Sequence, residues 1–395
     1  MDQQKSIVFL GFCDFPFGFA EAQKIILISK ALILKENNVT VICRNGTGSK
    51  KENPELKTEG IYENIGYRYV SGSCFRNERF FQRRLLELKG RINEVLLLRK
   101  RKKEDKLDYA VLSTRNVTTI AFYYTLAKVF KFKIILNYVE FYTAAEKSKL
   151  QIFKRINDRL FDKYAPSLSD AVFPISEFLI NHLKKNCPAK PYLKIPGLTD
   201  FDRYNDIETL QKEKYFLFCG SAGYKEIIFF IIDSFELVSS SSYYLYLVVN
   251  GSESEMQEIE AFIKTKKKKE KIRVLTKLAQ KKLFTYYKNA LSLLIPLRPT
   301  FQDMARFPHK TGEYLASGNP VISTKFGEIK NYFTDMENML LAESYDNQLF
   351  AEKMQFIIDN PEESKKIGAA GKELAAILFD YRYKANELNE FLNKL

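Results

Sequence analysis

Short apolar runs alternate with longer segments of helical periodicity along most of the chain. In the first half the runs, which we interpret as strands, lie at 5–12, 39–44, 108–114, 133–139 and 171–176. Helical periodicity separates them over 21–36 and 117–130, and a further long helix precedes the last run. Helices between short apolar strands are typical of parallel βαβ units. The first half is therefore predicted to form a doubly wound sheet.

The same alternation restarts after a break at 194–205, a polar stretch that contains Pro196 and Gly197. Strand-like runs then lie at 215–220, 243–251, 272–276, 290–297 and 320–324, with helical segments from about 225 and over 253–263, 280–289 and 309–317. We predict two doubly wound domains, at 1–198 and 199–377. The helical segment 378–395 could pack back on the first domain.

The composition is that of a globular chain of two or three domains, with 395 residues of which 46% are hydrophobic. The five cysteines are widely spaced and form no C-x-x-C pair, and there are two histidines, so neither a disulfide framework nor a metal site is indicated. The N-terminal segment lacks the features of a signal peptide, and no apolar run approaches the roughly 18 residues of a spanning helix. We expect a cytoplasmic protein.

The net charge of +14 is concentrated in one amphipathic segment, 79–106, which holds eleven Lys/Arg and four Asp/Glu. Its apolar residues recur at helical spacing beside a basic face: Phe81, Leu85, Leu88, Ile92 and Val95. Two interpretations stay open. The stripe packs on the core of the first domain, which is the commoner arrangement, or the helix lies on an anionic membrane surface. No recognised nucleic-acid-binding motif is present, so nucleic acid is not an expected partner.

The segment 307–324, FPHKTGEYLASGNPVIST, joins a short helix to a buried strand. Pro308 suits a first helical turn, and Gly318 ends the helix. Lys310 lies in that first turn, where the helix dipole disfavours a cation unless an anion lies between them. Glu313 shares the face of the lysine, and a carboxylate accepts hydrogen bonds from sugar hydroxyls. Taken alone, the segment fits either a phosphate and sugar site or an exposed Lys310–Glu313 ion pair.

Loops that follow strands are candidate sites, because ligands of doubly wound sheets bind beyond the carboxyl ends of the strands. The loop after the first strand carries Gly18 just before a helix, where backbone can approach a ligand closely. The loop after the first strand of the second half carries Ser221 and places Lys225 at a helix start. A later loop adds Arg298 ahead of Lys310. Positive charge thus gathers at one edge of the predicted sheets.

These motifs resemble those of glycosyltransferase family 4, also called glycosyl transferase group 1, whose members have the GT-B fold. EYLASGNPVIST at 313–324 is similar to the family's E-a-x-a-x-G-x-P-V-I segment, and GSAGYKEI at 220–227 resembles its G-R-x-x-x-K-G phosphate loop. Further likenesses follow in chain order at 17–32, 169–179 and 195–200. The resemblance implies an α/β GT-B fold, with two Rossmann-like domains that face each other across a cleft.

The resemblance also implies an activity, which is retaining transfer of a hexosyl group from a nucleotide-sugar donor to a hydroxyl acceptor, without a required metal or other cofactor. Domain 1–198 would take a sugar or lipid-linked acceptor and domain 199–377 the nucleotide sugar. The expected setting is the synthesis of a polysaccharide, cell-surface glycan or glycolipid. The protein would then be peripheral on the inner face of the cell membrane.

Carried over residue by residue, the resemblance assigns Glu313 to the ribose, Lys225 to the diphosphate, and Gly18 to the donor phosphate and acceptor. The expected donor-binding residues are Gly18, Ser221, Lys225, Arg298, His309, Lys310, Thr311 and Glu313. The expected catalytic residues are Lys225, Lys310 and Glu140. No metal ligand is expected.

Three departures from the family pattern affect these roles. The first glutamate of the family's E-x7-E motif would fall at Ala305, so the usual contact with the donor sugar is absent. Ser221 stands where arginine is usual. Glu140 lies near the place of a functional histidine in many members. Outside these motifs, Glu328 follows a strand and is expected to be a solvated loop carboxylate.

Two other functions fit the same architecture. A nucleotide-sugar epimerase would use acid and base groups near the sugar, and the alanine at 305 and the scarcity of histidine weigh against it. A catalytically degenerate donor-binding scaffold would explain the missing arginine and glutamate. Isomerisation of a nucleotide sugar alone would indicate the epimerase, whereas binding without transfer or hydrolysis would indicate the scaffold.

Overall fold

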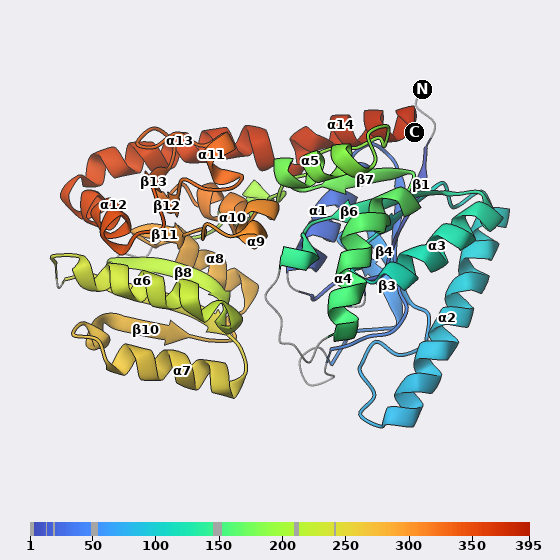
Figure 1. The fold of residues 1–395 in the computed structure, drawn as a ribbon, viewed down its shortest axis with the longest axis horizontal. Helices are drawn as coiled ribbons and strands as arrows, with labels where there is room; N and C mark the ends of the chain where they lie inside the picture. The colour runs from blue at the N-terminus through green and yellow to red at the C-terminus, as the bar shows by residue number, and fades with distance from the viewer. Residues whose placement is uncertain are drawn as a thin grey trace. The chain divides into compact units, whose positions relative to one another are not determined.

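The computed structural model describes residues 4–12, 14–18, 20–48, 54–144, 152–208, 213–240 and 242–395. The chain divides into two compact units, each with its own sheet. The first combines Met1–Leu198 with Tyr381–Leu395, and the second is Thr199–Asp380. Both are α/β units built on mainly parallel sheets (Figure 1), which is the predicted fold class.

The described part of the first unit contains a seven-stranded sheet in the order β3–β4–β2–β1–β5–β6–β7. Its strands are β1 (Ser6–Leu10), β2 (Asn38–Cys43), β3 (Glu59–Tyr62), β4 (Ile65–Tyr69), β5 (Tyr109–Leu112), β6 (Lys133–Tyr138) and β7 (Ala171–Pro174). Neighbouring strands pair in parallel except β3 and β4. In the centre, Val8 of β1 pairs with Thr40 on one side and Ala110 on the other.

The antiparallel β3–β4 hairpin was missed by the sequence prediction. Glu63 and Asn64 form its two-residue turn with φ of 47° and 66°, the left-handed values that a type I′ hairpin turn needs. β3 lies at the edge of the sheet and is largely exposed, including Ile61. An edge strand of this kind has no apolar run, so the pattern of buried positions gave no signal for it.

Helices cover both faces of this sheet (Figure 1). α1 (Ala20–Ile33) and α14 (Tyr381–Lys394) share a core with one face. α2 (Phe80–Lys103) and α3 (Val117–Phe130) share a core with the other face. α4 (Ile152–Tyr164) packs beside α3, and its Phe161 ring contacts Tyr138 of β6. α5 (Glu177–Asn186) follows β7.

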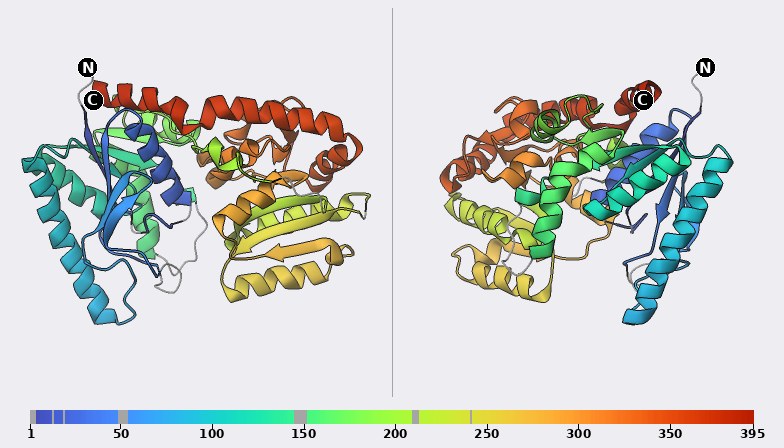
Figure 2. Two further views of the ribbon diagram at one scale, coloured as in Figure 1. Left: turned by 180° about the vertical axis from the view of Figure 1, so that it is seen from behind. Right: turned by 45° about the vertical axis from the view of Figure 1, so that its right-hand side comes forward.

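The C-terminal helix α14 packs on α1 within the first unit (Figure 2). The hydroxyl of Tyr109 donates to the Leu392 carbonyl at 2.7 Å, and the Asn37 and Asn389 side chains are hydrogen-bonded at 3.1 Å. The second unit extends to Asp380 rather than to residue 377, because α13 continues to Phe379 and the Phe379 ring packs on Phe307.

The described part of the second unit contains a six-stranded parallel sheet in the order β10–β9–β8–β11–β12–β13. Its strands are β8 (Tyr215–Ser221), β9 (Tyr244–Asn250), β10 (Ile272–Leu275), β11 (Ser292–Ile295), β12 (Val321–Thr324) and β13 (Leu340–Ala342). Its helices are α6 (Lys225–Leu237), α7 (Glu253–Lys264), α8 (Gln280–Lys288), α9 (Phe301–Ala305), α10 (Lys310–Ala316), α11 (Ile329–Tyr332), α12 (Asn347–Asp359) and α13 (Pro361–Phe379). The short helices α9 and α11 were not predicted.

The amphipathic segment at 79–106 forms α2, but the stripe does not pack on the core, so the commoner arrangement is wrong here. The buried residues of α2 are Gly90, Glu94 and Leu98, and the apolar stripe on the opposite side is exposed. Glu94 explains the orientation, because its carboxylate accepts hydrogen bonds from the Arg44 guanidinium at 2.8 and 3.0 Å and from the Tyr123 hydroxyl at 2.7 Å. Only glycine fits at position 90, where a Cβ would come within 2.7 Å of the Arg44 carbonyl oxygen.

Candidate functional site

The loop after β8 forms a tight turn at the carboxyl edge of the second sheet. The Ser221 hydroxyl accepts a hydrogen bond from the Gly223 amide at 3.2 Å. The loop after β9 lies against this turn, because a Cβ at Gly251 would come within 2.3 Å of the Ala222 Cβ. α6 then starts at Lys225, so the free N–H groups of its first turn lie at this edge.

Lys225 is exposed and forms an ion pair with Glu258 of α7, with 2.5 Å between Nζ and Oε2. The hydrogen bond and charge of Glu258 raise the pKa of Lys225. The side chain is therefore charged at neutral pH. A phosphate that binds at this loop would compete with Glu258 for the ammonium group.

Arg298, on the loop after β11, is held by acidic side chains from two directions. Its Nε lies 3.1 Å from the buried Asp303 carboxylate, and one terminal nitrogen lies 3.0 Å from Glu226, the residue after Lys225. Asp303 also pairs with Arg306 at 2.6 Å. Two arginines thus share one buried carboxylate, and Glu226 is the second carboxylate that faces Arg298 at the carboxyl edge of the sheet.

The start of α10 places Lys310 beside the end of β8. Burial acts to lower the pKa of Lys310, but the neighbouring Cys219 sulfur and the Glu313 carboxylate outweigh burial and the pKa is raised. The Tyr314 hydroxyl accepts a hydrogen bond from the Cys219 amide at 2.9 Å. α10 is therefore attached directly to the strand from which the phosphate-loop candidate emerges.

Three buried tyrosines fix α10. Tyr204 donates a hydrogen bond to the Glu313 carbonyl at 2.6 Å, and the Tyr287 ring lies 5.0 Å from the Tyr314 ring. Glu313 itself is 8% exposed. The hydrogen bond holds the backbone of Glu313, and burial restricts the movement of its carboxylate before any ligand binds.

The other predicted positions on α10 are held differently. The His309 ring lies over the same helix, with Nε2 3.7 Å from Glu313 Oε1. Thr311 is fully buried, and its hydroxyl makes no hydrogen bond to any described residue. Its side chain therefore faces the interior of the second unit.

Two further positions lie on α9 and in the loop after β12. Ala305 is fully buried, and the carboxylate of this region is Asp303, two residues earlier. Glu328 is 1% exposed, so its interpretation as a solvated carboxylate is wrong. The loop that carries it packs tightly, since a Cβ at Gly327 would lie 2.9 Å from the Asp303 carbonyl oxygen.

Gly18 and Glu140 belong to the first unit, at the carboxyl edge of its sheet. A Cβ at Gly18 would come within 2.7 Å of the Phe12 ring and 3.0 Å of Ala22, so the close approach here is between the loop and its own helix. Glu140 is half-buried after β6. Its charge, like that of Glu21, contributes after burial to a raised pKa of Tyr142, which places these groups together.

Lys24 of α1 was missed by the sequence reasoning. It is 5% exposed, and its Nζ makes no hydrogen bond to any described residue. Burial lowers its pKa to about 7, while the charge of Glu21 one turn earlier acts in the opposite direction. The signal in the sequence was the position of Lys24 among the apolar residues of a predicted helix. A single lysine in an apolar stripe does not by itself indicate a buried charge.

The segments that carry the predicted residues of the second unit therefore lie at one edge of its sheet. Cys219 contacts α10, and Glu226 contacts Arg298, so the loops after β8 and β11 and the start of α10 meet at the end of β8. This arrangement can bind an anion with charged side chains and helix N–H groups. The residues that sequence reasoning missed are Asp303 and the three tyrosines, because tyrosine is too common in this chain to stand out.

Comparison with known proteins assigns this region to a family. Residues 200–374 match the family model for glycosyl transferases group 1. An uncharacterized glycosyltransferase of Methanocaldococcus jannaschii is 25% identical over 220 residues, a match that covers 56% of this chain and 58% of that protein. The matched part thus spans little more than half of the archaeal relative.

Solved structures resemble the whole chain. Sucrose-phosphate synthase from Thermosynechococcus elongatus has a TM-score of 0.78 at 15% identity, and the match covers 99% of each chain. The Anabaena protein HepE in complex with UDP and glucose has a TM-score of 0.71 at 14% identity, over 99% of this chain and all of that one. A glycosyltransferase from Rickettsia africae has a TM-score of 0.72 at 14% identity, over 99% of each chain. This chain therefore has the GT-B fold, and its residues 200–374 resemble the group 1 glycosyl transferases.

Proposed function

We propose that the protein is a retaining glycosyltransferase that moves a hexosyl group from a nucleotide-sugar donor to a hydroxyl acceptor. The observation that carries the proposal is the meeting of the β8 loop, the β11 loop and α10 at one edge of the second sheet. There Lys225, Arg298 and Lys310 supply positive charge, and Glu313 supplies a fixed carboxylate. This is the charge pattern that a diphosphate linked to a sugar requires.

The cations act on the leaving group. Cleavage of the sugar–phosphate bond places negative charge on the departing diphosphate, so fixed cations and helix N–H groups stabilise the transition state more than the ground state. Lys310 lies beside Cys219 and Glu313 at the end of β8. Arg298 replaces the charge that Ser221 lacks. The charge is thus supplied by side chains, and we propose that the reaction requires no metal.

Glu313 is proposed to accept hydrogen bonds from the nucleotide ribose, with His309 beside it. The tyrosines that hold the backbone of α10 keep this carboxylate in place. A preorganised acceptor pair reduces the entropy lost when the nucleotide binds. The Thr311 hydroxyl is proposed to act only through the packing of α10, because it faces the interior.

The first unit is proposed to bind the acceptor. Glu140, Glu21 and Tyr142 gather at the carboxyl edge of its sheet, and Gly18 shapes the loop that precedes α1. Carboxylate and phenol groups form hydrogen bonds with sugar hydroxyls. The HepE structures, which contain UDP with glucose or UDP-glucose, support a nucleotide-sugar donor for this chain as well.

The product is proposed to be a cell-surface glycan or glycolipid, made by a protein that works in the cytoplasm at the membrane surface through α2. Within the described residues, no helix combines the length and the hydrophobicity needed to cross a bilayer. The exposed apolar stripe and basic flanks of α2 support a peripheral contact.

The test is a transfer assay on the full chain with a panel of nucleotide sugars and hydroxyl acceptors, in buffer with and without EDTA. We expect release of nucleoside diphosphate in both buffers, a product with the anomeric configuration of the donor by NMR, and a loss of about a hundredfold in turnover for Lys225→Ala. An inverted product would refute retention. Isomerised donor without transfer would replace the proposal with an epimerase, and binding without transfer or hydrolysis would replace it with a scaffold.

A further inference from the structure

α4 carries a second amphipathic face, which points away from the core of the first unit. Its apolar residues Ile152, Ile156, Leu160 and Tyr164 recur every four residues, and all are exposed. Phe153 is 89% exposed. Residues four apart lie on one face of a helix, so these side chains form a continuous stripe.

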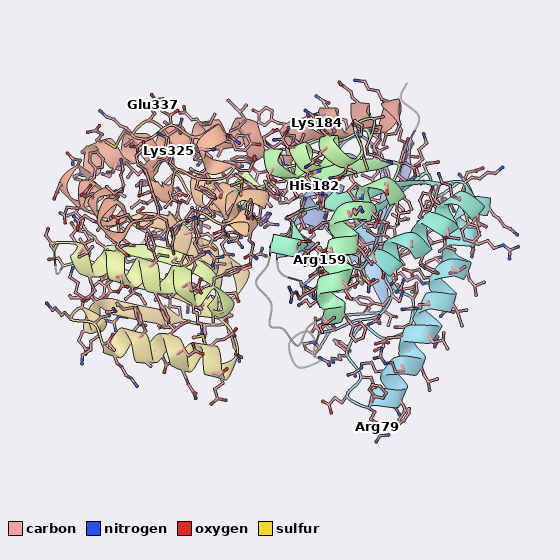
Figure 3. The ribbon with its side chains drawn as sticks, in the orientation of Figure 1. Arg79, Arg159, His182, Lys184, Lys325 and Glu337 are labelled. Carbon is pink, nitrogen blue, oxygen red and sulfur yellow. The ribbon has the colours of Figure 1, made fainter. Side chains whose placement is uncertain are left out.

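Basic side chains run beside this stripe. Lys154, Arg155, Arg159 and Lys163 are all exposed, and Arg159 is labelled in Figure 3. The acidic residues of α4, Asp158 and Asp162, are both buried. The outer face of α4 is therefore apolar and positively charged, with its negative charges turned inward.

The buried carboxylates set this orientation. Asp162 accepts hydrogen bonds from the backbone amides of Tyr142 at 3.3 Å and Thr143 at 2.7 Å. Rotation of α4 that buried its apolar stripe would break these bonds and expose Phe161, which packs against Tyr138. The helix is thus fixed with its apolar side outward.

α2 has the same construction. Phe81, Leu85, Leu88, Ile92 and Leu96 are exposed along one stripe, and exposed cations such as Arg84, Arg91, Lys89 and Lys100 flank it on both sides. Its inward side is fixed by the pairing of Glu94 with Arg44. Two helices of one unit thus expose apolar stripes. Buried ion pairs and hydrogen bonds hold both helices in this orientation.

The two stripes belong to one helical layer. α2 and α4 lie on either side of α3, and all three cover the same face of the first sheet (Figure 1). Because the inner sides of α2 and α4 rest on the same sheet face, their outer sides both point away from it. A flat partner could contact both helices at once.

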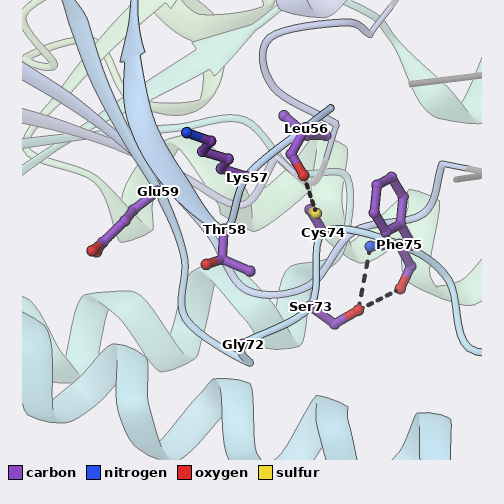
Figure 4. Close-up of a pocket in the computed structure, with 8 residues that line it drawn as sticks. All are labelled: Leu56, Lys57, Thr58, Glu59, Gly72, Ser73, Cys74 and Phe75. Atoms are coloured by element: carbon purple, nitrogen blue, oxygen red, sulfur yellow. Dashed lines mark hydrogen bonds between the residues drawn. The ribbon is translucent and has the colours of Figure 1, made fainter. Parts of the chain in front are cut away.

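A groove of about 530 Å³ beside α2 extends the basic surface. Arg68 of β4 and Lys89 and Lys100 of α2 line it, together with Glu59, which lies 3.3 Å from Arg68 and leaves the two lysines as the cations for a phosphate. A neighbouring hollow, lined by 56–59 and 72–75, shares Thr58, Glu59 and Gly72 with the groove (Figure 4). The groove can accommodate a phosphate-bearing group next to the apolar stripe.

Charge decides between the two occupants that fit an apolar surface. A second copy of the chain would bring two basic faces together, and like charges across an interface oppose association. An anionic bilayer supplies the complementary charge, and its acyl layer accepts the apolar stripes.

We propose that the outer faces of α2 and α4 form one docking surface for a bilayer that contains anionic phospholipid, with lipid phosphates bound in the groove beside α2. The docking surface deepens the proposed function, because a lipid-linked acceptor would lie in such a bilayer. It rests on the proposed function only in that respect. α4 supplies a contact that is independent of the 79–106 segment.

The test is co-sedimentation of the full chain with phosphatidylcholine vesicles that contain or lack phosphatidylglycerol, at low and high salt. We expect salt-sensitive binding to the anionic vesicles. Each surface cation contributes about fivefold to vesicle binding. The triple variant Arg155→Gln/Arg159→Gln/Lys163→Gln should therefore weaken vesicle binding about a hundredfold. Phe153→Ser/Ile156→Ser should weaken it at least tenfold. The matched controls in the second unit, Lys281→Gln/Lys282→Gln/Lys366→Gln and Ile377→Ser, alter exposed residues and should bind as the wild type does.

Binding by the α4 variants at the wild-type level would overturn the proposal. So would a dimer in analytical ultracentrifugation that the α4 variants abolish, because the face would then join two copies. Binding of inorganic phosphate by the groove without binding of vesicles would also contradict it. The α4 variants should keep the thermal shift given by nucleotide, so a chain that binds vesicles but no nucleotide would refute the proposed function and leave the docking surface intact.

Discussion

Helices usually bury apolar side chains and expose charged ones. α10 in the second unit and α2 in the first depart from this rule in opposite ways. α10 holds the carboxylate of Glu313 and the ammonium of Lys310 among buried tyrosines. α2 leaves a row of apolar side chains in solvent while it buries Glu94. Under the two proposals above, each helix serves a ligand of a particular chemistry, a charged small molecule for α10 and an apolar layer for α2.

The largest effect is expected on α10. Lys310→Met should lower turnover on the order of a thousandfold, because it removes a cation that is proposed to stabilise the leaving group. Steady-state kinetics with saturating donor would measure this. Lys325→Met is the matched control, since Lys325 is an exposed lysine paired with Glu343 on the second unit. Equal loss in both variants would mean that α10 has no special role.

The next effect is on the inner side of α2. Glu94→Ala should destabilise the first unit by about 3 kcal/mol, because it leaves the Arg44 charge without its buried partner. Glu87→Ala, on the same helix, removes an exposed pair with Arg84 and should cost no more than about 0.5 kcal/mol. Denaturant unfolding of both variants gives the comparison. Similar midpoints for the two would contradict a structural role for the buried pair.

α1 also buries a charge, and its Lys24 ammonium has no hydrogen-bond partner within the described part of the chain. The pKa of Lys24 falls from 10.5 to about 7 on folding, so between these values the unfolded chain binds more protons than the folded one. The free energy of unfolding therefore rises with pH across this window, by at most about 1.4 kcal/mol per pH unit. Below pH 7 the folded state bears the full cost of burying the Lys24 charge. Lys24→Met should remove this rise and stabilise the first unit most at pH 7 and below. If the free energy of unfolding changed with pH equally in the wild type and in Lys24→Met, the lowered pKa of Lys24 would be contradicted.

The smallest effect is expected on the outer side of α2. Leu88→Ser should change the free energy of unfolding by less than about 0.5 kcal/mol, since the side chain is exposed. Leu98→Ala, on the buried side of the same helix, should cost about 2 to 5 kcal/mol. Thermal unfolding of the pair measures this difference. A large loss at Leu88 would show that the stripe is covered in solution.

The sequence was sufficient to predict the strands and helices that follow from local periodicity. The strands other than β3, β4 and β13, and the helix around Lys310, were predicted, because buried parallel strands read as short apolar runs and capping residues mark helix ends. The contacts that orient the helices were not predictable. The ion pair of Arg44 with Glu94 joins residues fifty positions apart, and periodicity alone left open whether the apolar stripe of α2 packs on the core.

The candidate site shows the same division. Lys225, Arg298, Lys310 and Glu313 were found from their positions after strands and from family motifs. Asp303 and Glu328 were missed or judged solvated, because their burial depends on how the loops after β11 and β12 pack together. Burial of a loop carboxylate is a property of the tertiary structure.

The most direct test of the central claim, that the second unit binds the diphosphate of a nucleotide sugar, is a thermal-shift titration of the full chain with UDP, GDP and ADP. A ligand that binds only the folded state raises Tm according to its affinity. We predict that at least one of these nucleotides raises Tm, that the rise is much smaller in Lys310→Met, and that Lys325→Met retains it. No rise with any nucleotide, or an equal rise in Lys310→Met, would contradict the account.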